Sequence, residues 1–218
     1  MTEAGRRGSS ARASEFVVGL GVVFCGGESR RMGRDKALLE VRGSTLLERA
    51  VACLSAVVSE VVLACGAQDR YQRFGRERVL DRRPGMGPLA GLEAALCRMR
   101  GQGTDPERSI LYALACDMPM AEPEVFRALC ARLGTSGSDA VLLSSERGVE
   151  PLYGVYRASV LPAVERALER GDQRLVSFHG EIAVARLDRS ELGGSFAEAC
   201  ATNVNTPEEF RAVGGSFE

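Results

Sequence analysis

The chain has 218 residues, of which 45% are hydrophobic and 26% are charged, a balance typical of a protein that folds around a buried core. Its formal net charge of −1 gives no reason to expect nucleic acid or an anionic membrane as a partner. No apolar run approaches the roughly 18 residues that a membrane-spanning helix needs. The seven cysteines form no C-x-x-C pair, which favours reduced core thiols of a cytoplasmic protein over disulfides.

Helices and strands are expected to alternate along the chain. We expect a disordered polar tail over 1–14 and one folded domain over 15–218, whose first strand is the apolar run 16–24. Helices are expected at about 45–58, 88–100, 122–133, 159–169, 172–178 and from 206 on, and further strands at 60–65, 79–80, 109–116, 139–144, 150–156 and 182–187. This alternation predicts a single doubly wound α/β domain with a mostly parallel sheet.

Start signals support three of these helices. Thr45 and Glu48 have the spacing of a capping box, and so do Thr206 and Glu209. Pro88 suits the first turn of its helix. Because ligands of such folds bind beyond the carboxyl ends of the strands, we expect the polar residues that follow strands to gather at one edge of the sheet.

The densest motif lies between the first strand and the first helix. Gly26 and Gly27 end the strand, and the segment that follows is rich in basic residues, namely Arg30, Arg31, Arg34 and Lys36. Glycines let backbone N–H groups approach an anion closely, so this segment predicts a polyphosphate site. The glycine spacing matches neither the Walker A nor the dinucleotide pattern, and the alternative is a surface turn with solvated arginines.

Two aspartates follow buried strands. A carboxylate such as Asp117, directly after the most apolar strand, can hold Mg²⁺ against phosphate oxygens. Its alternative role is to cap the next helix, and Asp81, before a Pro-Gly turn, has the same two interpretations. Lys36 either neutralises a triphosphate or is a solvated lysine at a helix start.

Five segments of this chain resemble, in the same order, the signature segments of the molybdenum cofactor guanylyltransferases. The first reads Gly-Gly-Glu-Ser-Arg-Arg-Met-Gly-Arg-Asp-Lys, and Phe24 and Cys25 precede it where the signature has Leu and Ala. The others are Pro-Gly-Met-Gly-Pro-Leu-Ala-Gly, Cys-Asp-Met-Pro, Glu-Pro-Leu and Asn-Val-Asn-Thr-Pro-Glu. The resemblance covers roughly residues 16–213.

The resemblance implies a nucleotidyltransferase fold and an enzyme that transfers GMP from GTP to molybdopterin, releasing pyrophosphate with the help of Mg²⁺. It also implies a cytoplasmic protein whose further partners are molybdoenzymes or their chaperones. Carried over by position, the nucleotide-lining residues are Phe24, Cys25, Gly26 and Gly27, with Gly66 where the family often has Asn. Lys36 binds phosphates and Asp81 the nucleoside. Asp117 holds GTP and Mg²⁺, Arg31 offsets charge, and Asn203 and Asn205 lie on the molybdopterin side.

Three other functions stay open on the sequence. Cytidylyltransferases of the same cofactor tend to carry Ala-Ala-Gly where this chain has Cys25, Gly26 and Gly27, so Gly26, together with the later Asp-Lys pair at 35–36, favours guanine. Sugar-phosphate nucleotidyltransferases usually need a longer chain. The third alternative is a non-catalytic nucleotide-binding protein that recruits molybdoenzymes, against which the intact Lys36 and Asp117 argue.

Overall fold

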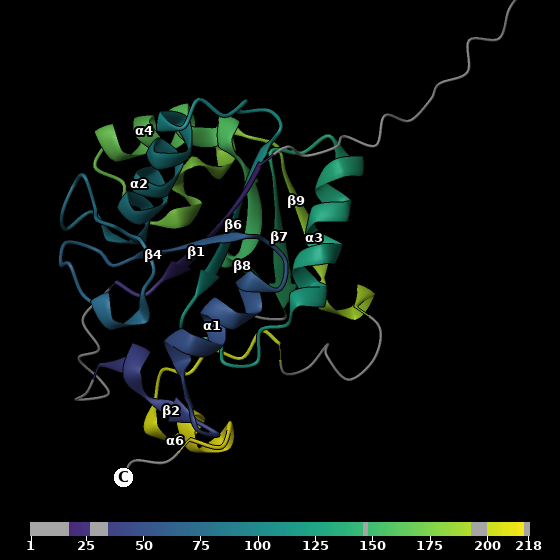
Figure 1. Cartoon of the computed structure of the whole chain (residues 1–218). Coiled ribbons are helices and arrows are strands. Elements are labelled where there is room, and N and C mark those ends of the chain that lie inside the picture. The colour runs from purple at the N-terminus through teal and green to yellow at the C-terminus, as the bar shows by residue number, and fades with distance from the viewer. Residues whose placement is uncertain (1–17, 27–34, 146–147, 193–199, 216–218) are drawn as a thin grey trace, which may run out of the picture.

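Figure 1 shows the computed structural model of the chain, which describes residues 18–26, 35–145, 148–192 and 200–215. The predicted tail over 1–14 lies outside the described residues, and so do Gly27 and Arg31. The described part forms one α/β domain in which helices cover both faces of a central sheet (Figure 1). This arrangement confirms the predicted fold class.

The central sheet has seven strands in the order β5-β4-β1-β6-β8-β7-β9. Their bounds are β1 Val18–Phe24, β4 Glu60–Ala64, β5 Arg78–Val79, β6 Ser109–Ala115, β7 Ala140–Ser145, β8 Gly148–Arg157 and β9 Val184–Asp188. Strand β8 runs antiparallel to both of its neighbours, and every other neighbouring pair is parallel. The prediction of a mostly parallel sheet is confirmed, with β8 as its exception.

Four helices enclose the sheet. Helices α1 (Leu46–Ser55) and α3 (Pro123–Ser136) pack on one face, and α2 (Gly87–Gly101) and α4 (Leu161–Glu169) on the other (Figure 1). All seven residues of β6 are buried, as expected for a central strand whose two faces are both covered by helices. Two separate apolar layers therefore hold the sheet rigid, and its ends are free to carry polar groups.

The predicted capping boxes are both present. The Thr45 hydroxyl accepts from the Glu48 backbone N–H at 3.1 Å, and the Glu48 carboxylate accepts from the Thr45 N–H at 2.8 Å. Thr206 and Glu209 form the same pair at the start of α6 (Pro207–Ala212). Helix α1 ends at Ser55 rather than 58, because the chain must turn to begin β4 at Glu60.

Two local predictions were wrong or incomplete. The segment expected as a helix at 172–178 is a 3-10 helix, Leu175–Glu181, whose start no side chain caps. The chain also contains an unpredicted hairpin of β2 (Glu40–Val41) and β3 (Ser44–Thr45). Its two turn residues, Arg42 and Gly43, have φ of 52° and 77°, the positive values that a two-residue hairpin turn requires.

The hairpin and α6 form a small apolar cluster of their own, seen together at one end of the molecule in Figure 1. Its buried members are Leu39, Val41, Leu46, Val204 and Phe210. Val204 lies between the two asparagines of the fifth signature segment. The cluster therefore anchors that segment to the part of the chain that precedes α1.

Candidate functional site

The chain reverses its direction of travel across the sheet between β1 and β6. From β1 it proceeds to β4 and then β5 on one side, and it then crosses to β6 on the other side of β1. The carboxyl ends of β1 and β6 are tied together by a hydrogen bond from the Cys116 N–H to the Phe24 carbonyl at 3.0 Å. Ligands of open α/β sheets bind in the crevice at such a reversal.

One group of predicted residues forms a continuous backbone strip across the ends of β1, β4 and β5. The N–H groups of Cys25 and Gly26 both donate to the Ala64 carbonyl, at 3.0 and 2.9 Å. The Asp81 N–H donates to the Gly66 carbonyl at 2.9 Å. We call these residues, Phe24–Gly26, Gly66 and Asp81, the nucleotide strip.

Gly26 leaves no room for a side chain. A Cβ atom at this position would lie 2.7 Å from the Gly66 nitrogen and 2.9 Å from the Cys65 carbonyl carbon. Gly66 itself has φ of 72°, in the left-handed region that glycine adopts freely and that asparagine tolerates best among other residues. Glycine in place of the family's Asn therefore suits the backbone and removes an amide side chain.

The second group of predicted residues surrounds an ion pair. The Lys36 Nζ lies 2.7 Å from Asp117 Oδ2 and donates to Asn205 Oδ1 at 3.0 Å. The Val204 N–H donates to the Asp117 carbonyl at 2.9 Å, which places Asn203 and Asn205 on either side of that contact. The Lys36 and Asp117 side chains are 14% and 25% exposed, so a ligand can reach both.

Neither aspartate has the capping role that the sequence left open. Helix α3 begins only at Pro123, after Glu122, and α2 begins after Met86. The carboxylates of Asp117 and Asp81 can therefore take part in ligand binding. Burial raises the pKa of Asp81 above its ordinary value, and the nearby Glu93 carboxylate raises it further.

Two further groups near these residues were not predicted. Glu93, in the interior of α2, is 1% exposed and lies with Oε1 3.3 Å from the Arg83 Nε. The buried Tyr71 donates its hydroxyl to the carboxylate of Asp35. Glu93 could have been found from the sequence, because it is a glutamate in an otherwise apolar helix face. The contact of Tyr71 with Asp35 could not, because it joins residues 36 positions apart and has no spacing signature.

The thiols of Cys25 and Cys116, at the ends of β1 and β6, are unsuited to nucleophilic chemistry. The sulfur atoms of Cys25 and Cys65 lie 3.8 Å apart, and the hydrogen bond between them, together with burial, raises the pKa of Cys25. Burial raises the pKa of Cys116 to about 12. Because the thiolate is the reactive form, the Cys25 and Cys116 thiols fill space at the strip rather than attack a substrate.

The donor set at this edge fits a cation that is shared with a ligand. Among the described residues, no three His, Cys, Asp or Glu side chains are placed to hold a metal ion together. Asp117 contributes one carboxylate just after the carboxyl end of β6. Mg²⁺ is commonly held by one or two carboxylates, with substrate phosphates and water as its other ligands.

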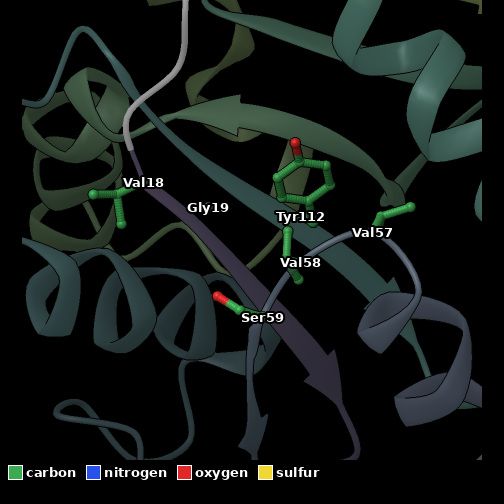
Figure 2. Close-up of a pocket in the computed structure, with 6 residues that line it drawn as sticks. All are labelled: Val18, Gly19, Val57, Val58, Ser59 and Tyr112. Carbon is green, nitrogen blue, oxygen red and sulfur yellow. The ribbon is translucent and has the colours of Figure 1, made fainter.

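A cavity elsewhere in the molecule lacks comparable chemistry. This space of about 250 Å³ lies at the start of β1, the opposite end from Phe24. Figure 2 shows the residues that line it, namely Val18, Gly19, Val57, Val58, Ser59 and Tyr112. None of these side chains is charged.

The described helices include none long and apolar enough to cross a membrane. The carboxyl edge of the sheet is thus the candidate site.

Comparison with known proteins gives the family of this chain. Residues 21–184 match the family described as MobA-like NTP transferase domain. A protein of Opitutus terrae named probable molybdenum cofactor guanylyltransferase is 40% identical over 201 residues, spanning 92% of this chain and 95% of the relative. Another of that name, from Carboxydothermus hydrogenoformans, is 32% identical over 192 residues, spanning 88% and 92%.

A solved structure agrees with these sequence relatives. Molybdopterin-guanine dinucleotide biosynthesis protein A from Archaeoglobus fulgidus has a TM-score of 0.75 and 25% identity, with 89% of this chain and 96% of that chain covered. The resemblance seen in the five signature segments is confirmed. This chain is a nucleotidyltransferase that belongs to the MobA-like NTP transferase family.

Proposed function

We propose that this chain transfers GMP from GTP to molybdopterin, forming the guanine dinucleotide of the molybdenum cofactor and releasing pyrophosphate. The observation that carries the proposal is the Lys36–Asp117 pair, 2.7 Å apart, directly after the carboxyl end of β6. The choice of molybdopterin as acceptor and of guanine as nucleobase rests on the names of the relatives. We place the reaction in the cytoplasm, where the seven thiols stay reduced, with molybdoenzymes or their chaperones as recipients of the product.

The nucleoside end of GTP is assigned to the nucleotide strip. Its backbone is immobilised by hydrogen bonds between neighbouring strand ends, and Gly26 is exposed. Phe24, Cys25 and Gly26 would line the base, and Gly27 would continue that surface. Asp81 would contact the ribose through its half-buried carboxylate. A preformed strip loses little conformational entropy when it binds a nucleotide.

The triphosphate is assigned to Lys36. Without a ligand, its ammonium group and the Asp117 carboxylate neutralise each other. A bound triphosphate would give Lys36 a new anionic partner, and Asp117 would then be available for a divalent cation, which we take to be Mg²⁺. That cation would supply charge neutralisation between the phosphates and the carboxylate.

The transfer step needs no protein base. An oxygen of the acceptor's phosphate monoester attacks the α-phosphorus of GTP, a new P–O bond forms, and the bond to the β-phosphate oxygen breaks to release pyrophosphate. The attacking phosphate is already anionic, so charge repulsion is the main obstacle. Lys36 and Arg31 would offset the charge that accumulates on the leaving pyrophosphate, while Asn203 and Asn205 orient the acceptor.

One observation favours guanylyl over cytidylyl transfer. Cytidylyltransferases of this cofactor tend to carry Ala at the position of Gly26, and a Cβ atom there would lie 2.7 Å from the Gly66 nitrogen. The strip of this chain is therefore built for the glycine form of the signature. A binding protein without catalytic activity would not need Lys36 and Asp117 in contact.

The deciding experiment incubates the protein with molybdopterin, Mg²⁺ and each nucleoside triphosphate in turn, and identifies the dinucleotide by mass spectrometry. GTP should be used at least about tenfold better than CTP, which requires only about 1.4 kcal/mol of difference in transition-state binding. Equal use of the two nucleotides would remove the guanylyl assignment. Nucleotide binding without any dinucleotide would favour the recruiting function instead.

A further inference from the structure

Tyr71 holds an unusual position beside the nucleotide strip. It lies in the segment between β4 and β5, its residue is 6% exposed, and its backbone φ is 69°. Few residues with a side chain adopt this left-handed conformation, which persists only where surrounding contacts enforce it. The ring packs edge-on against Phe74 with centroids 6.1 Å apart, and the Arg70 guanidinium lies 5.2 Å from its centre.

The hydroxyl of this fixed ring points at the phosphate-binding segment. It donates to the Asp35 carboxylate, with oxygen-to-oxygen distances of 3.0 and 2.9 Å to Oδ1 and Oδ2. It also lies 3.4 Å from the Cys25 carbonyl oxygen at the end of β1. Burial, and then the hydrogen bond to Asp35, raise the pKa of Tyr71, so the group stays a protonated donor at neutral pH.

Asp35 in turn fixes the backbone that carries Lys36. Its Oδ1 accepts from the Ala37 N–H at 3.1 Å and so caps the 3-10 helix Lys36–Leu38. The direction in which Lys36 leaves the backbone depends on this cap. A continuous series of contacts therefore runs from Tyr71 through Asp35 to Lys36, whose ammonium group reaches Asp117.

We infer that Tyr71 is a positioning residue for triphosphate binding, which acts through Asp35 to hold Lys36 in the orientation that meets the phosphates. The inference rests on the phosphate-binding role proposed for Lys36. The Arg70 guanidinium, 3.8 Å from Asp35 Oδ2, screens the same carboxylate but does not replace the hydroxyl, because it is farther from it than hydrogen-bond distance.

The test compares two tyrosines that are both buried and hydrogen-bonded. Tyr71→Phe keeps the ring and removes only the donor to Asp35. Tyr156→Phe is the matched control, since Tyr156 is fully buried and donates to the Pro151 carbonyl at 2.6 Å within β8. Tyr71→Phe should raise the Kd for GTP about tenfold at an unchanged fold, whereas the control should bind GTP as the unaltered protein does.

A double variant separates this inference from the role of Lys36. If Tyr71 acts through Lys36, then Tyr71→Phe should weaken GTP binding no further in a Lys36→Ala background, although both changes lower the melting temperature independently. Additive losses of GTP affinity, or normal affinity in Tyr71→Phe alone, would overturn the inference. Normal affinity in Lys36→Ala would instead remove the proposed role of Lys36, and the inference with it.

Discussion

The two halves of the central sheet are built from the same layers but do different work. In the half formed by β5, β4, β1 and β6, every strand is followed by a residue of the candidate site. Both halves bury large side chains, but no described residue of the candidate site directly follows β8, β7 or β9, and Tyr153 and Tyr156 of β8 are fully buried. Parallel strands gather their carboxyl ends at one edge, whereas the antiparallel β8 breaks that concentration. Substitutions at the strand ends of the first half should therefore cost activity, and those inside β8 should cost stability.

The largest loss of activity is expected for a substitution of Asp117, in the first half of the sheet. Asn has nearly the same shape as Asp and still offers Lys36 an oxygen, but it lacks the charge that holds a divalent cation. Asp117→Asn should lose about 10²–10³-fold in guanylyl transfer, the range seen when one charge-stabilising group is removed. Its melting temperature should fall by no more than that of Lys36→Ala, because Asp117 caps no helix and Asn keeps an oxygen for Lys36. Thermal melting and Mg²⁺-dependent turnover on one preparation check this, and a fully active variant would eliminate Asp117 as the metal ligand.

The next largest effect is expected at Lys36. A charge-assisted contact with the triphosphate exists before and during the reaction, so Lys36→Ala should weaken GTP binding and turnover together. Losing such a contact costs about 1.5–3 kcal/mol, or roughly one to two orders of magnitude in affinity. Titration calorimetry with GTP and steady-state kinetics give the two values. Unchanged affinity and rate would show that Lys36 is only a structural partner of Asp117 and Asn205 and does not bind the triphosphate.

Alanine substitution of one glycine in each half of the sheet tests the difference between the halves directly. At Gly154 of β8, a Cβ atom would lie 2.5 Å from Leu142 Cδ2, a contact inside the apolar core. Gly154→Ala should lower stability by about 1–3 kcal/mol, the usual cost of overpacking, and leave the KM for GTP unchanged. Gly26→Ala should instead raise the KM for GTP, because it separates the strip at the Gly66 nitrogen. Denaturant unfolding and GTP kinetics on both variants would reveal the opposite pattern if the division between the halves were wrong.

The smallest effect concerns Asp81 and pH. Burial raises its pKa in the folded chain, so the ionised form is less stable there than in the unfolded chain. Stability contributed by this group is therefore lost as pH rises from the unfolded pKa of about 3.9 through the higher folded value. Asp81→Asn should raise the melting temperature at pH 7 by about 1 °C and leave it unchanged near pH 3. GTP binding should weaken in the same variant, and a melting temperature that falls at pH 7 would contradict this account.

The sequence indicated which residues gather at the sheet edge where a residue directly follows a strand. Asp117 and Gly26 stand next to the ends of apolar runs that are visible in the pattern. The direction of β8 could not be predicted, because the alternation of side chains along a strand is the same whichever way the strand runs beside its neighbours. The contact of Tyr71 with Asp35 depends on how the segment after β4 folds back, and no local spacing reports that. The two-residue strands of the hairpin were too short to show alternation.

The hydrogen bond between Lys36 and Asn205 spans 169 positions of the chain. Its two residues are therefore synthesised far apart in time. A ribosome delivers β1, β4, β5 and β6 first, so the nucleotide strip and the Lys36–Asp117 pair are synthesised well before α6. Asn205 reaches its place only when Val204 and Phe210 pack onto the hairpin. The nascent chain therefore contains the residues that we assign to GTP binding before it contains Asn203 and Asn205, which we assign to the acceptor.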